Sequence, residues 1–268
     1  MIADPIEHFL VWCARDRGRS VRTIARYRIT LTTAEDACGN LITADIADLE
    51  EWWESRYGHA PATRANELAC LRSFYKWATR FDHRPDDPTR RLDPPKIPNH
   101  IPRPIGEADL SRLLGELTAD APDLRRAVAL GAYAGLRVSE VAGLSWADVD
   151  QDRRRIYVRG KGGKERAFGL SPVLLDKILP ETVGNVVTAG GDPYTGAVLQ
   201  RKINRLMSRH RIGHTFHNLR ARAATLALAK GENTFAVAMA FGWSSVETAK
   251  SYAVVGDEAL DRIAAAVV

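Results

Sequence analysis

The sequence predicts a mainly α-helical protein, with a helical N-terminal bundle followed by a mixed α/β domain that contains a small antiparallel sheet. Three observations lead to this prediction. Residues 4–81 repeat apolar side chains at helical spacing between cap and stop signals. Seven prolines lie between Arg84 and Ile105, where they disfavour both helix and central strand. Beyond them the helical pattern returns, interrupted by one stretch with the alternating period of a β-hairpin.

Four helices are expected in the N-terminal region. The first carries an apolar stripe and ends at Gly18. The second begins at a plausible N-cap, Ser20, and ends at Gly39, while the third runs from a cap at Thr43 to Gly58. The fourth places basic side chains away from its apolar face. Together they predict a small bundle with basic outer faces.

The charge of the chain indicates a polyanionic partner. The formal net charge is +5 and the sequence pI is near 9.2, with Lys and Arg recurring through both halves. Nucleic acid is therefore favoured over a small-molecule substrate. The candidates for contacts with phosphate, chosen from their helical faces, are Arg22, Arg26, Arg64, Arg72 and Lys76.

Several classes of protein are disfavoured by the composition. No stretch approaches the roughly 18 consecutive apolar residues that a membrane span needs, so no membrane partner is expected. The first residues are acidic where a signal peptide would be basic. Cys13, Cys38 and Cys70 lack CxxC or metal-ligand spacing, so we expect reduced thiols in the cytoplasm.

The proline-rich stretch is interpreted as a semi-extended connector between domains, because loops of this length are uncommon inside a compact domain. The expected organisation is a helical domain over 1–84, a connector over 85–104 and a second domain over 105–256. The remaining residues, 257–268, form a tail whose apolar stripe is too short to be a stable helix alone.

A β-hairpin is expected within the second domain. Ile156 and Val158 alternate with polar neighbours, and Gly162 with Gly163 fits a tight turn. The stretch "GKGGK" lacks the spacing of a P-loop, so nucleotide binding is not expected there.

Four short stretches in the second domain carry reactive side chains: "AGLRVSEV", "RGKGGKER", "HTFHNLRARAAT" and "FGWSSVETAKSY". Each is weak alone. Together they resemble the tyrosine recombinase (integrase) family, whose pattern is Arg before Ser-Glu, Lys on a hairpin, His-x-x-Arg, His or Trp, and finally Tyr. The matching residues, in the family's order, are Arg137, Lys161, His217, Arg220, Trp243 and Tyr252.

The resemblance spans nearly the whole chain. "TRANELACLRSFYKWA" in the N-terminal region is similar to the family's core-binding (SAM-like) domain, and the second domain would then be catalytic. Two departures occur. Trp243 stands where many members have His, and Ala221 stands where a second His is common. Between two candidate lysines, Lys161 matches the family's "GKG" position better than Lys164.

The chemistry of these residue types suits attack on a phosphodiester. Arg137 and Arg220 can clamp nonbridging oxygens bidentately, as a lysine cannot. A phenol with a pKa of about 10 is a weak nucleophile until a neighbour accepts its proton, so Tyr252 would depend on a base such as His217. Lys161 could protonate the expelled 5′-oxygen, whereas Trp243 offers only an indole N–H and cannot shuttle protons.

The resemblance implies site-specific recombination through a 3′-phosphotyrosyl intermediate and a Holliday junction, with no cofactor, metal or ATP. The implied partners are double-stranded DNA attachment or core sites, three further copies in a homotetramer on synapsed DNA, and a recombination directionality factor. It also implies that the tail of 257–268 docks on a neighbouring protomer. The implied location is the cytoplasm of a bacterial host, in association with the nucleoid.

Alternative functions remain open at this point. A compact integrase of a phage or mobile element, without an arm-binding domain, is favoured over a Xer-type resolvase of chromosome or plasmid dimers. A type IB topoisomerase would use a similar residue set. A non-catalytic DNA-binding regulator on a recombinase scaffold is disfavoured by the full Arg-Lys-His-Arg-Tyr set.

Overall fold

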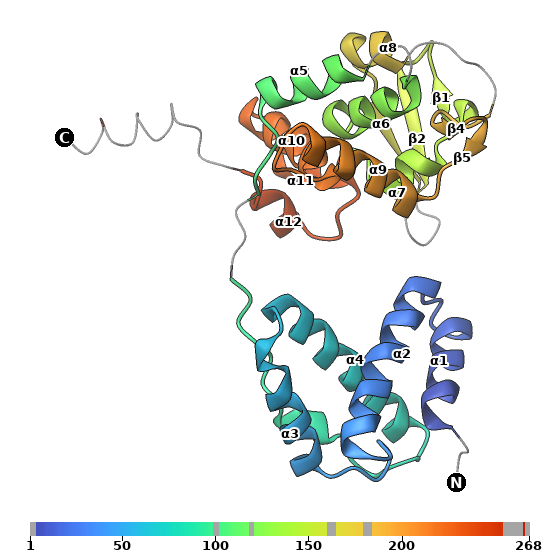
Figure 1. Cartoon of the computed structure of the whole chain (residues 1–268), viewed down its shortest axis with the longest axis vertical. Coiled ribbons are helices and arrows are strands. Elements are labelled where there is room, and N and C mark those ends of the chain that lie inside the picture. The colour runs from blue at the N-terminus through green and yellow to red at the C-terminus, as the bar shows by residue number, and fades with distance from the viewer. Residues whose placement is uncertain are drawn as a thin grey trace. The chain divides into compact units, whose positions relative to one another are not determined.

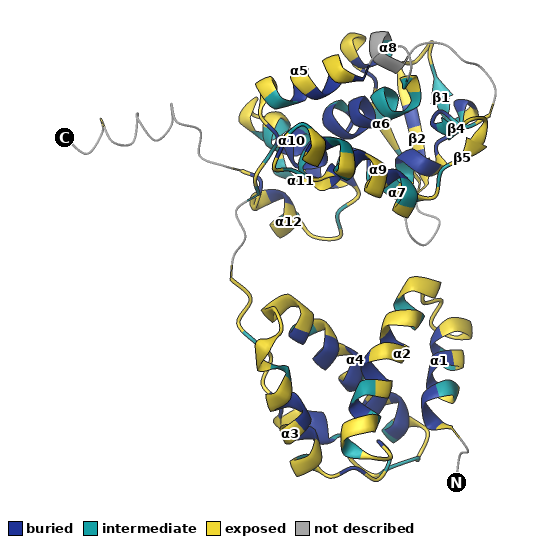
Figure 2. Ribbon diagram, viewed as in Figure 1, coloured by how far each residue is buried: buried dark blue, intermediate teal, exposed yellow. Residues whose placement is uncertain are grey.

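The computed structural model describes residues 4–98, 102–117, 121–159, 165–178, 184–253 and 265. It divides into two compact units, Met1–Asn99 and His100–Val268 (Figure 1). Each unit has its own set of buried apolar side chains (Figure 2). The prediction of a mainly helical protein with a small antiparallel sheet is confirmed.

The N-terminal unit is a helical bundle around an aromatic core. Phe9 lies at its centre, with the rings of Phe74 and Trp77 at centroid distances of 5.4 and 5.6 Å. Its elements are α1 (Pro5–Arg15), α2 (Val21–Cys38), α3 (Ile46–Ser55), η1 (Arg56–Gly58), α4 (Pro61–Arg80) and η2 (Pro88–Arg91).

Local capping chemistry sets the helix ends in this unit. Ser20 caps α2 by accepting a hydrogen bond from the Thr23 amide, and Gly39 ends the helix with a φ of +72°, as predicted. The predicted cap at Thr43 is wrong. Asp45 caps α3 in a reciprocal capping box with Asp48, because a carboxylate can accept the amide hydrogen bond at that position.

The first part of the proline-rich stretch differs from the extended connector that the prolines predict. Thr89 and Leu92 are buried, and Leu92 joins the core of the N-terminal unit. The guanidinium of Arg84 donates hydrogen bonds to the carbonyl oxygens of Leu41, Ile42 and Ala44. All three bonds come from Nη1, so one terminal nitrogen ties this turn of chain to the bundle.

The C-terminal unit consists of helices around a small sheet. Its elements are α5 (Glu107–Glu116), α6 (Pro122–Tyr133), α7 (Val138–Gly143), η3 (Trp146–Asp148), β1 (Val149–Asp150), β2 (Arg155–Arg159), β3 (Glu165–Gly169), α8 (Pro172–Ile178), β4 (Thr188–Ala189), β5 (Asp192–Pro193), α9 (Gly196–Arg209), α10 (Phe216–Ala229), α11 (Thr234–Phe241) and α12 (Val246–Lys250).

The sheet has the antiparallel order β1-β2-β3, and β2 pairs with β3 as the predicted hairpin. Ile156 and Val158 are buried while Tyr157 is exposed, so the predicted alternation is confirmed. In the register of the hairpin Val158 lies opposite Arg166. The predicted turn residues, Gly162 and Gly163, lie outside the described residues.

Helix α6 packs closely against α10 in the core of this unit. Gly131 permits the contact, since a Cβ added there would lie 2.9 Å from the ring of Phe216. A second, smaller apolar cluster joins α10 and α11 to Tyr252. Among the described helices, none is long and apolar enough to cross a membrane.

Candidate active site

Tyr252 lies directly after α12 and is only 6% exposed. Its ring stacks on Trp243, with centroids 5.0 Å apart and planes 11° from parallel. Its hydroxyl oxygen lies 3.4 Å from Nε2 of His217, which is the second residue of α10. The segment between α11 and Tyr252 therefore returns the phenol to the start of α10.

The surroundings of Tyr252 keep its phenol neutral. Burial raises the pKa of Tyr252, and the positive charges of Arg220 and Arg137 lower it in part. A neutral phenol must lose its proton as it attacks an electrophile. His217 Nε2 lies within reach of that proton, and the two guanidiniums favour the anion that forms.

Arg220 extends from α10 into the same cluster and is 3% exposed. Its guanidinium donates to the carbonyl oxygens of Gly135 and Phe241, the latter at 2.6 Å. The guanidinium carbon lies 5.1 Å from the ring centroid of Phe241 and 5.3 Å from that of Trp243. Burial, followed by the charge of Arg137, lowers the pKa of Arg220 to about 10. The side chain remains cationic at neutral pH.

Gly135 permits the close approach of α11 to this cluster. Its φ is +62°, a conformation that side chains with a Cβ rarely adopt. A Cβ at this position would lie 2.3 Å from Cε1 of Phe241. Glycine is therefore required here both by the backbone and by the packing of the ring.

Arg137 precedes α7 at its N-cap position. Its Nη1 donates to Oε1 of Glu140 at 2.8 Å, and its backbone amide donates to Oε2 of the same carboxylate at 2.7 Å. Its Nη2 donates to the carbonyl oxygen of Gly242 at 2.9 Å. The guanidinium is thus held from two sides, while the side chain is 39% exposed.

Arg166 on β3 belongs to the same cluster and was not among the residues singled out in the sequence. Its two terminal nitrogens donate to both oxygens of Glu140, at 3.0 and 2.9 Å. Burial raises the pKa of Glu140, but the hydrogen bonds from Arg166 and Arg137 outweigh it, and the net pKa is lowered. The signal in the sequence was an arginine at an inward position of an alternating strand.

The charges in this cluster do not balance. Arg137, Arg166 and Arg220 supply three cations, and Glu140 supplies one carboxylate. Cations at close range repel one another, and after burial the charge of Arg137 is the next cause of the lowered pKa of Arg220. An anion between Arg137 and Arg220 would relieve that repulsion. The cluster is therefore suited to bind a phosphate group and to stabilise further negative charge on it.

The start of α10 is fixed by Asn218, beside His217 in the sequence. The Asn218 side chain accepts hydrogen bonds from the amide and hydroxyl of Thr215. It also donates to the carbonyl oxygen of Arg103 at 2.6 Å. The chain that enters this unit is thereby tied to the first turn of the helix that carries His217 and Arg220.

The structure brings five of the six predicted residues of the site together: Arg137, His217, Arg220, Trp243 and Tyr252. Lys161 and its alternative Lys164 lie outside the described residues. They follow β2 and precede β3 in the sequence, on the hairpin that also carries Arg166.

The five basic candidates of the N-terminal unit fall into two groups. Four are exposed, as expected: Arg22, Arg26, Arg72 and Lys76. Arg72 also donates a hydrogen bond to the carbonyl oxygen of Leu92. Arg64 does not lie on an outer face. It is 8% exposed, with its guanidinium carbon 4.5 and 4.2 Å from two ring centroids, those of Trp53 and Tyr57.

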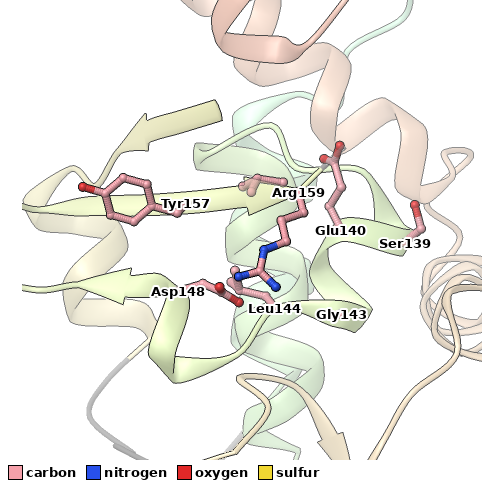
Figure 3. A pocket seen from close by; sticks show the side chains of 8 residues that line it. Ser139, Glu140, Gly143, Leu144, Asp148, Tyr157 and Arg159 are labelled. Atoms are coloured by element: carbon pink, nitrogen blue, oxygen red, sulfur yellow. The ribbon is translucent and has the colours of Figure 1, made fainter. Parts of the chain in front are cut away.

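A separate pocket of about 110 Å³ borders the other side of α7 (Figure 3). Figure 3 shows the Arg159 side chain reaching toward Asp148 and Leu144, while Tyr157 points away. Glu140 lines this pocket, but none of the five described residues of the predicted set does. Within the described residues, no group of three or more His, Cys, Asp or Glu side chains could hold a metal ion.

Comparisons with known proteins bear on the family and the fold of the chain. Residues 105–258 match the model of the Phage integrase family. The chain is 30% identical to tyrosine recombinase XerC of Corynebacterium efficiens, over 96% of this chain and 88% of that protein. It is 31% identical to tyrosine recombinase XerD of Xanthomonas axonopodis pv. citri, over 97% and 96%.

Solved structures share the fold. A lambda integrase dimer bound to a COC′ core site matches with a TM-score of 0.76 and 17% identity, over 92% of this chain and 93% of that one. A lambda integrase tetramer bound to a Holliday junction matches with a TM-score of 0.72 and 18% identity, over 90% and 76%. At these identities the likeness concerns the fold alone.

Proposed function

Since the chain belongs to the phage integrase family and is a tyrosine site-specific recombinase, we propose that Tyr252 is the nucleophile with which it cuts and rejoins DNA. One observation supports this assignment above the others. The Tyr252 hydroxyl lies 3.4 Å from His217 and in the field of two arginines, Arg137 and Arg220. A phenol, a base and two guanidiniums at one place suit attack on a phosphodiester.

In the proposed first step, the Tyr252 oxygen forms a bond to the scissile phosphorus while the bond from phosphorus to the 5′-oxygen breaks. His217 accepts the phenolic proton. Lys161 protonates the departing 5′-oxygen, so that a 3′-phosphotyrosyl link and a free 5′-hydroxyl result. In the second step a 5′-hydroxyl of the partner strand attacks the phosphotyrosyl bond and releases the phenol. One phosphodiester replaces another, and the exchange is balanced.

Arg137 and Arg220 bind the nonbridging oxygens in this proposal. Each guanidinium has five N–H groups, and the contacts with protein oxygens described above engage two of them. The remaining N–H groups can therefore donate to phosphate while the hydrogen bonds to protein oxygens are kept. Trp243 holds the Tyr252 ring by stacking and can donate its indole N–H, but it transfers no proton.

The substrate we propose is double-stranded DNA with attachment or core sites. The net charge of +5 and the exposed side chains of Arg22, Arg26 and Lys76 support electrostatic binding of the backbone. The related lambda integrase structures contain a core site and a Holliday junction. By analogy we propose that four copies act through a Holliday junction, with the tail of 257–268 docked on a neighbour and a directionality factor as a further partner.

Two biological roles fit this chemistry. We favour integration and excision of a phage or mobile element, and the Phage integrase family model supports it. Resolution of chromosome or plasmid dimers is the second candidate, and the full-length likeness to XerC and XerD supports that role. An attachment core overlapping or adjoining the gene would favour the first role over the second.

The assignment of the nucleophile is tested by Tyr252→Phe. This variant keeps the ring and its stacking on Trp243 but lacks the oxygen that would bond to phosphorus. A nicked suicide substrate should trap the wild-type protein as a covalent adduct, and the variant should give none at equal DNA occupancy. Tyr157→Phe on the exposed face of β2 is the matched control and should react as wild type. An adduct formed by Tyr252→Phe would place the nucleophile elsewhere.

A further inference from the structure

Arg166 lies outside the six residues that carry the proposed chemistry, yet it contacts the groups that hold them. We propose that Arg166 is a positioning residue for strand cleavage, which orients Arg137 through Glu140 and supports the start of the tyrosine-bearing segment. The inference rests on the proposed function. It concerns a side chain that is only 11% exposed and therefore acts through the protein.

The first argument concerns Glu140. Its Oε1 accepts from Nη1 of Arg137 and Nη1 of Arg166, and its Oε2 accepts from the Arg137 amide and Nη2 of Arg166. The carboxylate side chain is 6% exposed. A buried carboxylate depends on such partners, because water cannot replace them. Arg166 supplies two of these four hydrogen bonds. It therefore holds the carboxylate in the position from which Glu140 binds Arg137.

The second argument concerns the C-terminal end of α11. Three consecutive carbonyl oxygens there each accept a hydrogen bond from a different arginine. Arg166 Nε donates to Ala240 at 2.8 Å, Arg220 to Phe241 at 2.6 Å and Arg137 to Gly242 at 2.9 Å. The carbonyl end of a helix carries partial negative charge and has no partners within the helix. The three guanidiniums therefore share one anchor, from which the chain continues to Tyr252.

The third argument concerns the origin of these arginines. Arg137 comes from the start of α7, Arg220 from α10 and Arg166 from β3. Gly242 fits against Arg166, since a Cβ added at this glycine would lie 3.2 Å from its Nη1. Arg166 thus joins β3 to the carbonyl anchor. In the proposed reaction this holds β3 beside the phosphate clamp.

Loss of Arg166 should act on the rate more than on DNA affinity. Arg166→Gln leaves Glu140 with the Arg137 hydrogen bonds only, and Arg137 is then drawn toward an under-satisfied carboxylate instead of toward phosphate. Because Arg166 is almost fully covered, few DNA contacts should be lost. Arg166→Lys keeps the charge but cannot bind both carboxylate oxygens in a planar fork, so it should recover part of the rate.

The control is Arg126→Gln. Arg126 in α6 is 12% exposed and pairs with the carboxylate of Asp123, which is 25% exposed. The same substitution therefore removes an arginine that is as buried as Arg166 and is also paired with a carboxylate. The wild-type protein and the three variants would be compared with a nicked suicide substrate at saturating concentration. The single-turnover rate of adduct formation, normalised to bound protein, is measured together with DNA affinity and thermal stability.

We expect Arg166→Gln to form adduct about 10–100-fold more slowly than wild type, the loss typical of partners that orient a reactive ligand. Arg166→Lys should fall between the two, DNA affinity should change by about twofold or less, and Arg126→Gln should react as wild type. A wild-type rate in Arg166→Gln, or an equal loss in Arg126→Gln, would overturn the positioning role. An absence of adduct from the wild-type protein would instead overturn the proposed function.

Discussion

Arg64 in the N-terminal unit and Arg220 in the C-terminal unit have similar apolar surroundings. Each is almost fully buried, at 8% and 3% exposure, and each lies within 4.2–5.3 Å of two aromatic ring centroids. They differ in their charged neighbours. Arg220 shares its site with two further guanidiniums, those of Arg137 and Arg166, and one carboxylate. The site of Arg64 packs one cation on aromatic rings, whereas the site of Arg220 concentrates positive charge.

This difference separates structural from reactive arginines better than burial does. An arginine on two aromatic rings gains dispersion and cation–π attraction, which stabilise a fold. Three guanidiniums around one carboxylate repel one another, and the protein holds them together with carbonyl oxygens and Glu140. A protein stabilises such a cluster at a cost in folding free energy, so the excess charge indicates a site for an anion.

The same arginine-to-lysine substitution can be made in both units. The largest effect is expected for Arg220→Lys, on the rate of adduct formation. Arg220→Lys keeps one positive charge but loses the fork that reaches both protein carbonyls and phosphate. We expect the single-turnover rate of adduct formation to fall by about 10²–10³, as for removal of one transition-state donor. DNA affinity should change much less. A rate within about threefold of wild type would remove Arg220 from the phosphate clamp.

Arg64→Lys should affect stability instead. A lysine ammonium cannot stack as a plane on Trp53 and Tyr57, so the free energy of unfolding of the N-terminal unit should fall by about 1 kcal/mol. Urea unfolding read from amide protection in α3 and α4 would measure it. The rate of adduct formation by bound protein should be unchanged. A tenfold loss of that rate would show that Arg64 serves the reaction, and the contrast between the units would fail.

The smallest effect is a pH dependence in the C-terminal unit. The pKa of Glu140 in the folded protein is below its ordinary value of 4.5, so between these values the unfolded chain binds a proton that the folded chain does not. The stability from this carboxylate is full above pH 4.5 and is lost as the pH falls through the folded-state pKa. The free energy of unfolding cannot change by more than about 1.4 kcal/mol per pH unit for one proton.

Glu140→Gln provides the comparison for this effect. Urea unfolding from pH 3 to pH 7, read from amide protection in α7 and α10, would give the free energy of the C-terminal unit in both proteins. The advantage of wild type over the variant should shrink as the pH falls below 4.5. Parallel curves would mean that Glu140 is not the carboxylate whose pKa is lowered by folding.

The sequence predicted features that depend on neighbouring residues. The limits of α2 follow from Ser20 and Gly39, whose side chain and backbone freedom act within one turn. The buried and exposed faces of β2 follow from the alternation at Ile156 and Val158. The set from Arg137 to Tyr252 was found by its resemblance to the pattern of the tyrosine recombinase family, and the described members of the set meet in space.

Features that depend on distant contacts were not predicted. Arg64 has the spacing of a surface residue on α4, but the rings that cover it come from α3 and η1, eleven and seven positions earlier. Arg166 lies in a polar run of the hairpin, and its partners Glu140 and Ala240 are supplied by α7 and α11. Helical and strand periods describe one element at a time, so they cannot identify such partners.

The three carbonyl oxygens at the end of α11 also affect how variation in this protein should be interpreted. The arginines bind main-chain oxygens of Ala240, Phe241 and Gly242, which any amino acid supplies. A substitution at Ala240 can therefore pass unnoticed in a mutational scan while the bond to its oxygen stays essential. Replacement of the peptide bond between Ala240 and Phe241 by an ester would weaken the Ala240 carbonyl oxygen as an acceptor without altering a side chain. Tolerance to mutation at such a position measures the freedom of the side chain and leaves the function of the backbone untested.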